Sequence, residues 1–299
     1  MSESKELCGS CSTGAGQGKT GSPARAIQDE LISSTLSKIK YKIFVMSGKG
    51  GVGKSSIAVN LAAGLAHMGK KVGLLDVDIH GPSVPHLLGI KGLLDVERGR
   101  IIKPKQYNQN LAVVSMESLL KDPDQAILWR GPMKTSAIRQ FVSDVSWGEL
   151  DYLVIDSPPG TGDEPMTVLK TIPDALCIVV TTPQEISLAD VRKSINFLQY
   201  AKANILGLVE NMSGLICPHC AGEVSLFKKG GGKILAEKYG LVFLGAIPLD
   251  PASVVAGDTG RPVVLIEETS PAKEALKKLA VTVEEQASHS LEAVSTVHT

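Results

Sequence analysis

Short apolar runs alternate with segments of helical periodicity along most of the chain. The apolar runs are rich in β-branched residues and have the length of buried strands. They are YKIFVM (41–46), KVGLLD (71–76), LAVVSM (111–116), YLVIDSPP (152–159), ALCIVVTTP (175–183), ILGLVENM (205–212) and LVFLGAIP (241–248). Segments between them, such as 188–203 and 231–240, carry apolar residues at helical spacing. This alternation predicts an α/β fold of three layers, with a mostly parallel sheet flanked by helices on both faces.

The same pattern divides the chain into one domain and two flanking segments. Residues 1–26 are rich in Gly, Ser, Thr and Lys without apolar periodicity. We therefore expect a flexible tail there, which carries Cys8 and Cys11 as a CxxC pair. Residues 27–288 form the predicted α/β domain, and we expect residues 289–299 to fray.

A glycine-rich loop follows the first predicted strand. Residues 48–55, GKGGVGKS, fit the P-loop pattern GxxxxGK(S/T), and SIAVNLAAGLAHM continues as a predicted helix. In such a loop the glycines let backbone N–H groups face phosphates. The lysine, here Lys54, reaches the outer phosphates, and the hydroxyl, here Ser55, binds Mg²⁺. The sequence therefore predicts a nucleotide-binding site.

Acidic side chains stand at the ends of two predicted strands. Asp76 and Asp78 leave the second strand, and Asp156 leaves a later one. Because the carboxyl ends of parallel strands meet at one edge of a sheet, these residues should face the P-loop. Carboxylates there suit Mg²⁺, directly or through water, as phosphoryl transfer requires. Taken singly, each residue also fits a helix cap or a turn.

Cys217 and Cys220 form a second CxxC pair in the sequence CPHC. Such a pair suits a metal, an iron–sulfur cluster or a redox reaction. The residues after it lack the helical periodicity that a thioredoxin-like redox pair would show, and we interpret His219 as a solvated spacer. A [4Fe-4S] cluster or a structural zinc takes four ligands. Two chains related by a twofold axis, or the tail pair in the same chain, would complete the set.

Together these motifs resemble a known family. GKGGVGKSS resembles the deviant P-loop of the MinD, ParA and nitrogenase iron protein class, and DVDIHGPS (76–83) and DSPPGTGD (156–163) match its two switch regions. With WRGPM (129–133) and the late CxxC pair, the match resembles the Mrp/ApbC family of iron–sulfur cluster carrier ATPases over about residues 40–270. The resemblance implies a P-loop NTPase fold.

The resemblance also implies a role for individual positions. In the class the extra lysine, here Lys49, reaches the partner's nucleotide across a dimer interface. Asp78 would orient the attacking water and Asp156 would support Mg²⁺ through water, with Asp76 ambiguous between the two roles. Asn211 would hydrogen-bond adenine. The implied sets are Gly48, Lys49, Gly50, Gly51, Val52, Gly53, Lys54, Ser55, Ser56 and Asn211 for the nucleotide, Ser55 and Asp156 for Mg²⁺, and Cys217 and Cys220 for the cluster.

Composition narrows the class of partner. The 31 basic and 31 acidic side chains balance and aromatic residues make up 4%, which argues against nucleic acid or an anionic membrane as the partner. No apolar stretch has the length of a membrane span, and MSESKELCGS lacks the core of a secretory signal, so we expect a cytoplasmic protein. An odd total of five cysteines argues against a disulfide framework, and Cys177 is predicted to be a core residue.

These interpretations lead to one predicted function. We expect a homodimeric, Mg²⁺-dependent and slow ATPase that holds a labile [4Fe-4S] cluster at the subunit interface and delivers it to apo iron–sulfur proteins. Two alternatives share the loop and the aspartates. One is a spatial-regulation ATPase of the MinD or ParA type, which does not require the Cys217 and Cys220 pair. The other is an electron-transfer ATPase like the nitrogenase iron protein, whose cluster is permanent.

Overall fold

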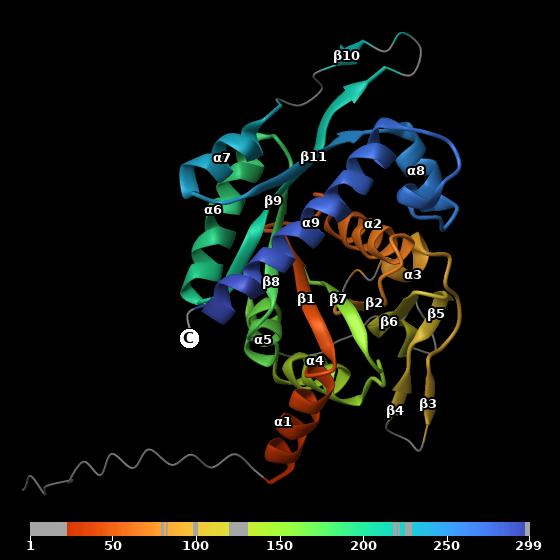
Figure 1. Ribbon diagram of the computed structural model, residues 1–299, viewed down its shortest axis with the longest axis vertical. Coiled ribbons are helices and arrows are strands. Elements are labelled where there is room, and N and C mark those ends of the chain that lie inside the picture. Colours follow the sequence, from red (N-terminus) through yellow and green to blue (C-terminus); the bar gives the residue numbers. More distant parts are fainter. Residues whose placement is uncertain are drawn as a thin grey trace, which may run out of the picture.

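The buried apolar runs form a parallel sheet at the centre of the molecule (Figure 1). The computed structural model describes residues 23–78, 81, 83–97, 101–119, 131–217, 220, 222–224 and 229–296. The parallel strands are β1 (Ile39–Met46), β2 (Val72–Asp76), β6 (Leu111–Ser115), β7 (Leu150–Asp156), β8 (Leu176–Thr181), β9 (Asn204–Ile216) and β11 (Phe243–Leu249). In the spatial order β11, β9, β8, β1, β7, β2, β6, each neighbouring pair is parallel. The mostly parallel sheet predicted from the sequence is confirmed.

Within the described residues, four shorter strands pair antiparallel and were not predicted. β5 (Lys105–Asn108) extends the sheet beside β6, and β10 (Glu223–Val224) pairs with the end of β9. β3 (Asp95–Glu97) and β4 (Ile101–Lys103) form a separate hairpin. These strands are short and largely exposed, so they lack the buried apolar pattern that identifies a strand in the sequence.

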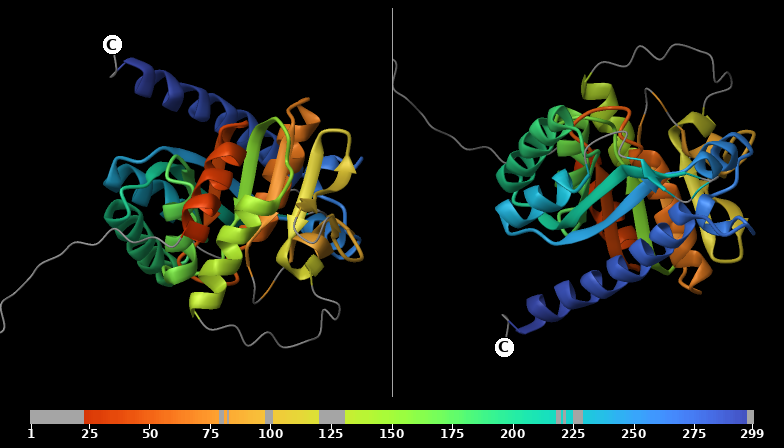
Figure 2. Two further views of the ribbon diagram at one scale, coloured as in Figure 1. Left: turned by 90° about the horizontal axis from the view of Figure 1, so that it is seen from below. Right: turned by 90° about the horizontal axis from the view of Figure 1, so that it is seen from above.

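Helices cover both faces of the sheet (Figure 2). They are α1 (Pro23–Leu36), α2 (Lys54–His67), α3 (Val84–Leu87), α4 (Gly131–Asp144), α5 (Asp163–Thr171), α6 (Glu185–Tyr200), α7 (Gly231–Tyr239), α8 (Pro251–Asp258) and α9 (Pro271–Thr296), with 3-10 turns η1 (Met116–Leu119) and η2 (Val263–Leu265). One apolar core lies between the sheet and α2 and α9. The other lies between the sheet and α1, α4, α5, α6 and α7.

The continuous apolar run of β1 follows from this double coverage. Successive side chains of a strand point to opposite faces of its sheet. Ile43 and Val45 accordingly enter the core under α2 and α9, while Phe44 and Met46 enter the core on the opposite face. All four side chains are fully buried. A strand covered on both faces therefore has no polar alternation, as the sequence indicated.

Both ends of the described chain are more helical than we expected. α1 begins at Pro23, inside the segment 1–26 that we predicted to be a tail, because proline is well suited to the first position of a helix. α9 continues through Thr296, past the predicted boundary at residue 288. The Ser288 hydroxyl donates to the Glu284 carbonyl within this helix. Cys8 and Cys11 lie outside the described residues.

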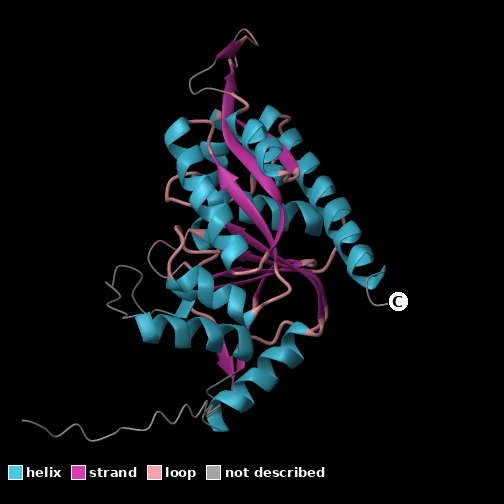
Figure 3. Cartoon of the chain, turned by 90° about the vertical axis from the view of Figure 1, so that its left-hand side faces the viewer, coloured by secondary structure: helices cyan, strands magenta, loops and turns pink. Residues whose placement is uncertain are grey.

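One strand extends beyond the layered body. Figures 1 and 3 both show the end of β9, with β10 beside it, projecting past the helices. We call the described residues from Met212 to Val224 the cysteine arm, since Cys217 and Cys220 lie on it. We predicted that this strand would end at residue 212, whereas it reaches Ile216. No helix in the described parts of the chain is both long and apolar enough to cross a membrane.

Candidate functional site

The predicted phosphate loop connects β1 to α2 at the carboxyl end of the sheet. Gly51 and Gly53 have φ angles of 78° and 80°, in the left-handed region that glycine adopts without strain. Gly48 passes so close to α6 that a Cβ atom there would lie 2.5 Å from the carbonyl oxygen of Asp190. Backbone geometry therefore requires these glycines, and the strand, loop and helix context of the motif is confirmed.

Asn211 reaches the phosphate loop from β9. Its Nδ2 atom donates a hydrogen bond to the Val52 carbonyl at 2.9 Å. A Cβ atom on Gly53 would lie only 2.2 Å from the same Nδ2 atom. The structure thus brings Asn211 to the loop, where it holds the loop backbone. Its contact with adenine stays a prediction.

Lys54 and Asp156 form a buried ion pair beside the loop. The Lys54 ammonium lies 2.6 Å from Asp156 Oδ1 and 3.2 Å from the Ser55 hydroxyl. Burial raises the pKa of the Asp156 carboxyl, and the Lys54 charge opposes the rise. Among the described residues no group hydrogen-bonds to Asp156 Oδ2, which is buried. A carboxylate oxygen of this kind near a serine hydroxyl fits a hard cation such as Mg²⁺.

Asp76 lies beside Asp156, because β2 and β7 are neighbours and these two residues are partners in their register. Asp76 Oδ2 accepts a hydrogen bond from the Ser115 hydroxyl at 2.9 Å, and Oδ1 accepts from the Asp78 backbone N–H at 3.0 Å. Burial, and then the charge of Asp156, raises the pKa of Asp76 well above its usual value. Asp78 is also buried and accepts from the Gly81 N–H at 3.2 Å. All three predicted aspartates therefore gather at one edge of the sheet.

Lys49 lies next to the exposed part of the loop, Gly50 and Gly51. Its carbonyl accepts a hydrogen bond from the Ser47 hydroxyl at 2.8 Å, which fixes the backbone there. Its side chain is half-buried, and within the described residues its ammonium has no hydrogen-bond or ion-pair partner. Exposure varies along the rest of the loop. Gly50 and Gly51 are exposed, Val52 is buried, and Ser56 is half-buried. The role of Lys49 toward a partner subunit stays a prediction.

The predicted cluster ligands lie on the cysteine arm. Cys217 is half-buried and Cys220 is exposed. The Cys217 N–H donates to the Gly222 carbonyl at 2.9 Å, which closes the turn that holds the pair. Pro218 and His219 lie outside the described residues. The residues after the turn form β10, so the pair does not open a helix as it would in a thioredoxin-like redox site.

Cys177 differs from the pair in its position and its burial. It lies within β8 and is fully buried. Burial raises the pKa of its thiol to about 12. The prediction that Cys177 is a core residue is confirmed.

Comparison with known proteins identifies the family. The family described as NUBPL iron-transfer P-loop NTPase, within the ParA group, matches residues 38–284. An iron–sulfur cluster carrier protein of Methanocaldococcus jannaschii is 49% identical over 255 residues, which cover 85% of this chain and 87% of that protein. The human cytosolic Fe-S cluster assembly factor NUBP2 is 46% identical over 250 residues, 82% of this chain and 92% of that protein.

The chain belongs to this family of iron-transfer P-loop NTPases. The resemblance seen in its motifs is thereby confirmed. A solved nucleotide-binding protein of Archaeoglobus fulgidus in complex with ADP is 42% identical, with a TM-score of 0.69 over 78% of this chain and 91% of that chain. The cell division ATPase MinD of Pyrococcus furiosus is 23% identical, with a TM-score of 0.61 over 82% of this chain and 98% of that chain. The second likeness shows the shared fold.

Sequence analysis of this NTPase missed one buried acid next to Asn211. Glu210 is fully buried in β9, and its carboxylate accepts hydrogen bonds from one side chain and two backbone N–H groups. An acidic residue inside an apolar run, followed later in the chain by the glycine triplet 230–232, was the available signal. The triplet supplies the two N–H groups, but their contact with Glu210 is visible only in the fold.

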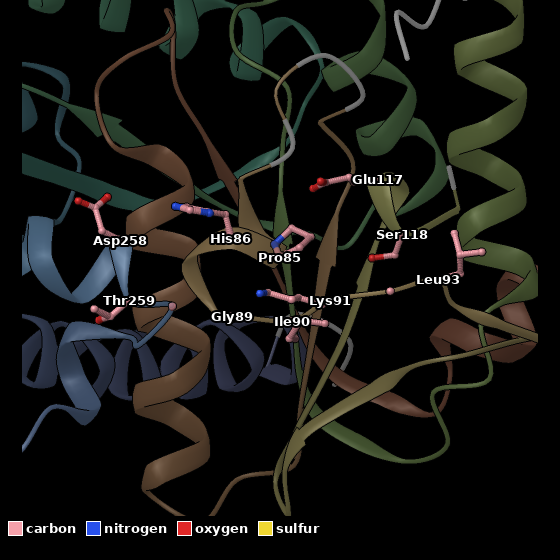
Figure 4. A pocket seen from close by; sticks show the side chains of 12 residues that line it. Pro85, His86, Gly89, Ile90, Lys91, Leu93, Glu117, Ser118, Asp258 and Thr259 are labelled. Atoms are coloured by element: carbon pink, nitrogen blue, oxygen red, sulfur yellow. The ribbon is translucent and has the colours of Figure 1, made fainter. Parts of the chain in front are cut away.

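A cavity of about 550 Å³ also escaped prediction. It lies between α3, η1 and the end of α8, and Figure 4 shows charged side chains of both signs around it, among them Lys91, Glu117 and Asp258. Its described lining includes none of the residues predicted for nucleotide, Mg²⁺ or cluster. In this NTPase the phosphate loop and the cysteine arm therefore remain the candidate site.

Proposed function

We propose that this chain is an ATP-hydrolysing carrier that binds a labile [4Fe-4S] cluster between two copies of itself and delivers it to apo iron–sulfur proteins. One observation carries the proposal. A single strand, β9, contacts the phosphate loop through Asn211 and continues to the cysteine pair that begins with Cys217. The names of its relatives, an iron–sulfur cluster carrier and a cytosolic Fe-S cluster assembly factor, support this function and a cytoplasmic location.

The residues around the loop are suited to phosphoryl transfer. Backbone N–H groups of the loop and the Lys54 ammonium would hold the phosphates, and Asp78 would orient the attacking water. Ser55 would hold Mg²⁺ directly and Asp156 would support it through water, and the bound Mg²⁺ would neutralise charge on the phosphate oxygens. Asp156 has a carboxylate oxygen available for this role. The Asn211 side-chain amide would accept and donate hydrogen bonds at the edge of adenine, and this would make ATP the preferred nucleotide.

Two features favour a dimer as the working form. The cysteine pair supplies two thiolates, and a [4Fe-4S] cluster generally takes four, so a twofold axis through the cluster would complete the set. Lys49, which is half-buried next to the exposed Gly50, would reach the nucleotide of the partner and stabilise charge on the transferred phosphoryl group. The end of β9 and β10 project from the body (Figure 1), and Cys220 is exposed, so a second copy could reach it.

Iron counting tests the proposal. Iron and sulfide are reconstituted anaerobically into the wild-type protein, into Cys217→Ala, and into the matched control Cys8→Ala/Cys11→Ala, and iron is measured per dimer. We expect about four iron atoms per dimer in the wild type and the control, and none in Cys217→Ala. Iron that depends on the tail cysteines would contradict the proposal. A chelator should then remove the cluster readily, whereas a chelator-resistant cluster would favour the electron-transfer alternative.

A further inference from the structure

A buried carboxylate lies at the base of the cysteine arm. Glu210 Oε1 accepts hydrogen bonds from the Ser213 hydroxyl at 2.5 Å and from the Gly230 backbone N–H at 3.0 Å. Oε2 accepts from the Gly232 N–H at 2.6 Å. Burial of a charged carboxylate costs free energy unless its oxygens accept hydrogen bonds in this way. Among the described residues, Glu210 is therefore held by three hydrogen-bond donors, none of which carries a charge.

These donors come from both ends of the arm. Ser213 lies on β9 where the chain leaves the body, and Gly230 and Gly232 lie where it returns and begins α7. A carboxylate at the N-terminus of a helix is favoured, because the first backbone N–H groups of the helix point toward it. One side chain thus ties the outgoing strand to the returning helix.

The glycine triplet 230–232 lets the backbone come close enough to Glu210 for these hydrogen bonds. Gly230 has a φ of 81°, which few other residues adopt. A Cβ atom on Gly232 would lie 3.0 Å from Glu210 Oε2, and one on Gly231 would lie 2.8 Å from Leu188 Cδ1. The three glycines therefore let the start of α7 approach both β9 and α6 closely.

The same segment of β9 contacts the phosphate loop. Glu210 and Asn211 are consecutive, so their side chains point to opposite faces of the sheet, one toward α7 and the other toward Val52. Just beyond them Met212 and Gly214 have positive φ angles of 56° and 76°. The backbone leaves regular strand geometry there, between the loop contact and the cysteines.

We propose that Glu210 is a positioning residue that makes the cysteine arm respond as one unit to nucleotide in the phosphate loop. The inference rests on the proposed function, in which the arm carries the cluster. Phosphates that bind the loop N–H groups would shift Val52 and, through its hydrogen bond, Asn211 and β9. Because Glu210 joins β9 to the returning chain, and β10 pairs with β9 beside the cysteines, Cys217 and Cys220 move with β9.

Thiol alkylation tests this without any cluster. The reduced, cluster-free protein is treated with iodoacetamide, with and without Mg²⁺ and the non-hydrolysable analogue AMP-PNP. Peptide mass spectrometry then gives the rate at each cysteine, with buried Cys177 as the unreactive internal standard. In the wild type, nucleotide should change the rates at Cys217 and Cys220 by about fivefold or more, which is the lower end of usual coupling between sites.

Glu210→Gln should remove most of this response. Glutamine has one acceptor oxygen in place of two, so one of the glycine N–H groups would face an amide NH₂. We expect the nucleotide effect on alkylation to fall below about twofold, while AMP-PNP affinity stays within about twofold of wild type. Glu237→Gln is the matched control, because Glu237 is exposed on α7, and it should keep the full response. Ser213→Ala keeps two of the three donors and should give an intermediate response.

The outcomes separate this inference from the proposed function. A wild-type response in Glu210→Gln would overturn the role of Glu210. If circular dichroism shows that Glu210→Gln is unfolded, Ser213→Ala decides, and an unchanged response there overturns the inference. A wild-type protein that loads iron but shows no nucleotide effect would overturn the inference alone. A nucleotide effect without iron loading would overturn the proposed function alone.

Discussion

Lys54→Met leaves the Asp156 carboxylate buried without the cation that it contacts at 2.6 Å. This lysine is the natural target for abolishing nucleotide binding, so the variant is expected to lose activity. The structure predicts a second effect, on the stability of the nucleotide-free fold. Both partners are buried, with side-chain exposures of 6% and 0%, so water cannot replace the lost contact.

The magnitude follows from the geometry of the pair. At the observed separation, with an effective dielectric constant of about 20, the gross attraction is about 6 kcal/mol. Desolvation of both ions offsets part of it, and breaking a buried pair by removing one partner costs about 3–5 kcal/mol. Since folded domains are stable by about 5–15 kcal/mol, Lys54→Met should lose a large share of the free energy of unfolding.

The loss should depend on pH, and its sign follows from Asp156. Burial raises the pKa of this carboxyl, and Lys54 opposes the rise, so in Lys54→Met the pKa goes higher still. A carboxyl whose folded pKa lies above its unfolded value lowers stability at high pH. This penalty disappears as the pH falls toward the unfolded pKa, because the folded state then binds the extra proton. The variant should be closer to wild type at about pH 5 than at about pH 8.

Urea unfolding without nucleotide, at both pH values, measures the effect. The control is Lys54→Met/Asp156→Asn, which removes the uncompensated charge and should recover most of the lost stability at the higher pH. The reasoning would be refuted by a loss in Lys54→Met that is equal at both pH values and is not recovered in the double variant.

Two further predictions follow from the loop. Gly53→Ala combines a φ of 80° with a Cβ atom 2.2 Å from Asn211 Nδ2, so it should cost about 1–3 kcal/mol of stability and weaken ATP binding. Urea unfolding and titration calorimetry measure both, and Gly50→Ala, whose Cβ meets nothing within 4 Å, is the control for stability. Lys49→Ala should leave stability within about 0.5 kcal/mol of wild type and keep ATP binding, yet lose turnover. Unimpaired steady-state hydrolysis would refute its role in the partner's site.

The local pattern of residues along the sequence was sufficient to predict the phosphate loop and the class of fold. The strand, loop and helix from Ile39 to His67 are contiguous, and each is specified by residues a few positions apart. The buried β-rich runs also predicted the parallel sheet, because strands covered on both faces carry apolar residues at every position. The cysteine pair at 217 and 220 was visible for the same reason, since its spacing is local.

The arrangement of the acids required the fold. Asp76 and Asp156 become neighbours because β7 lies between β1 and β2. The order of the strands in the sheet cannot be inferred from the residue pattern within each strand. The site therefore holds two neighbouring carboxyl groups and the buried Lys54 ammonium that pairs with one of them. The sequence predicted that these side chains share an edge of the sheet, while their hydrogen bonds and the directions of their pKa shifts came from tertiary contacts.

The proposed link between the nucleotide site and the cysteines shows the same division. By itself the sequence determined the loop, the aspartates as candidates and the thiol pair, since each is a short motif whose chemistry depends on residue type and spacing. Only the tertiary structure decided that β9 continues to Ile216 and that Glu210 bonds to Gly230 and Gly232. Contacts between segments far apart in the sequence depend on how the layers of the fold pack against one another. The spacing of residues within one segment does not determine that packing.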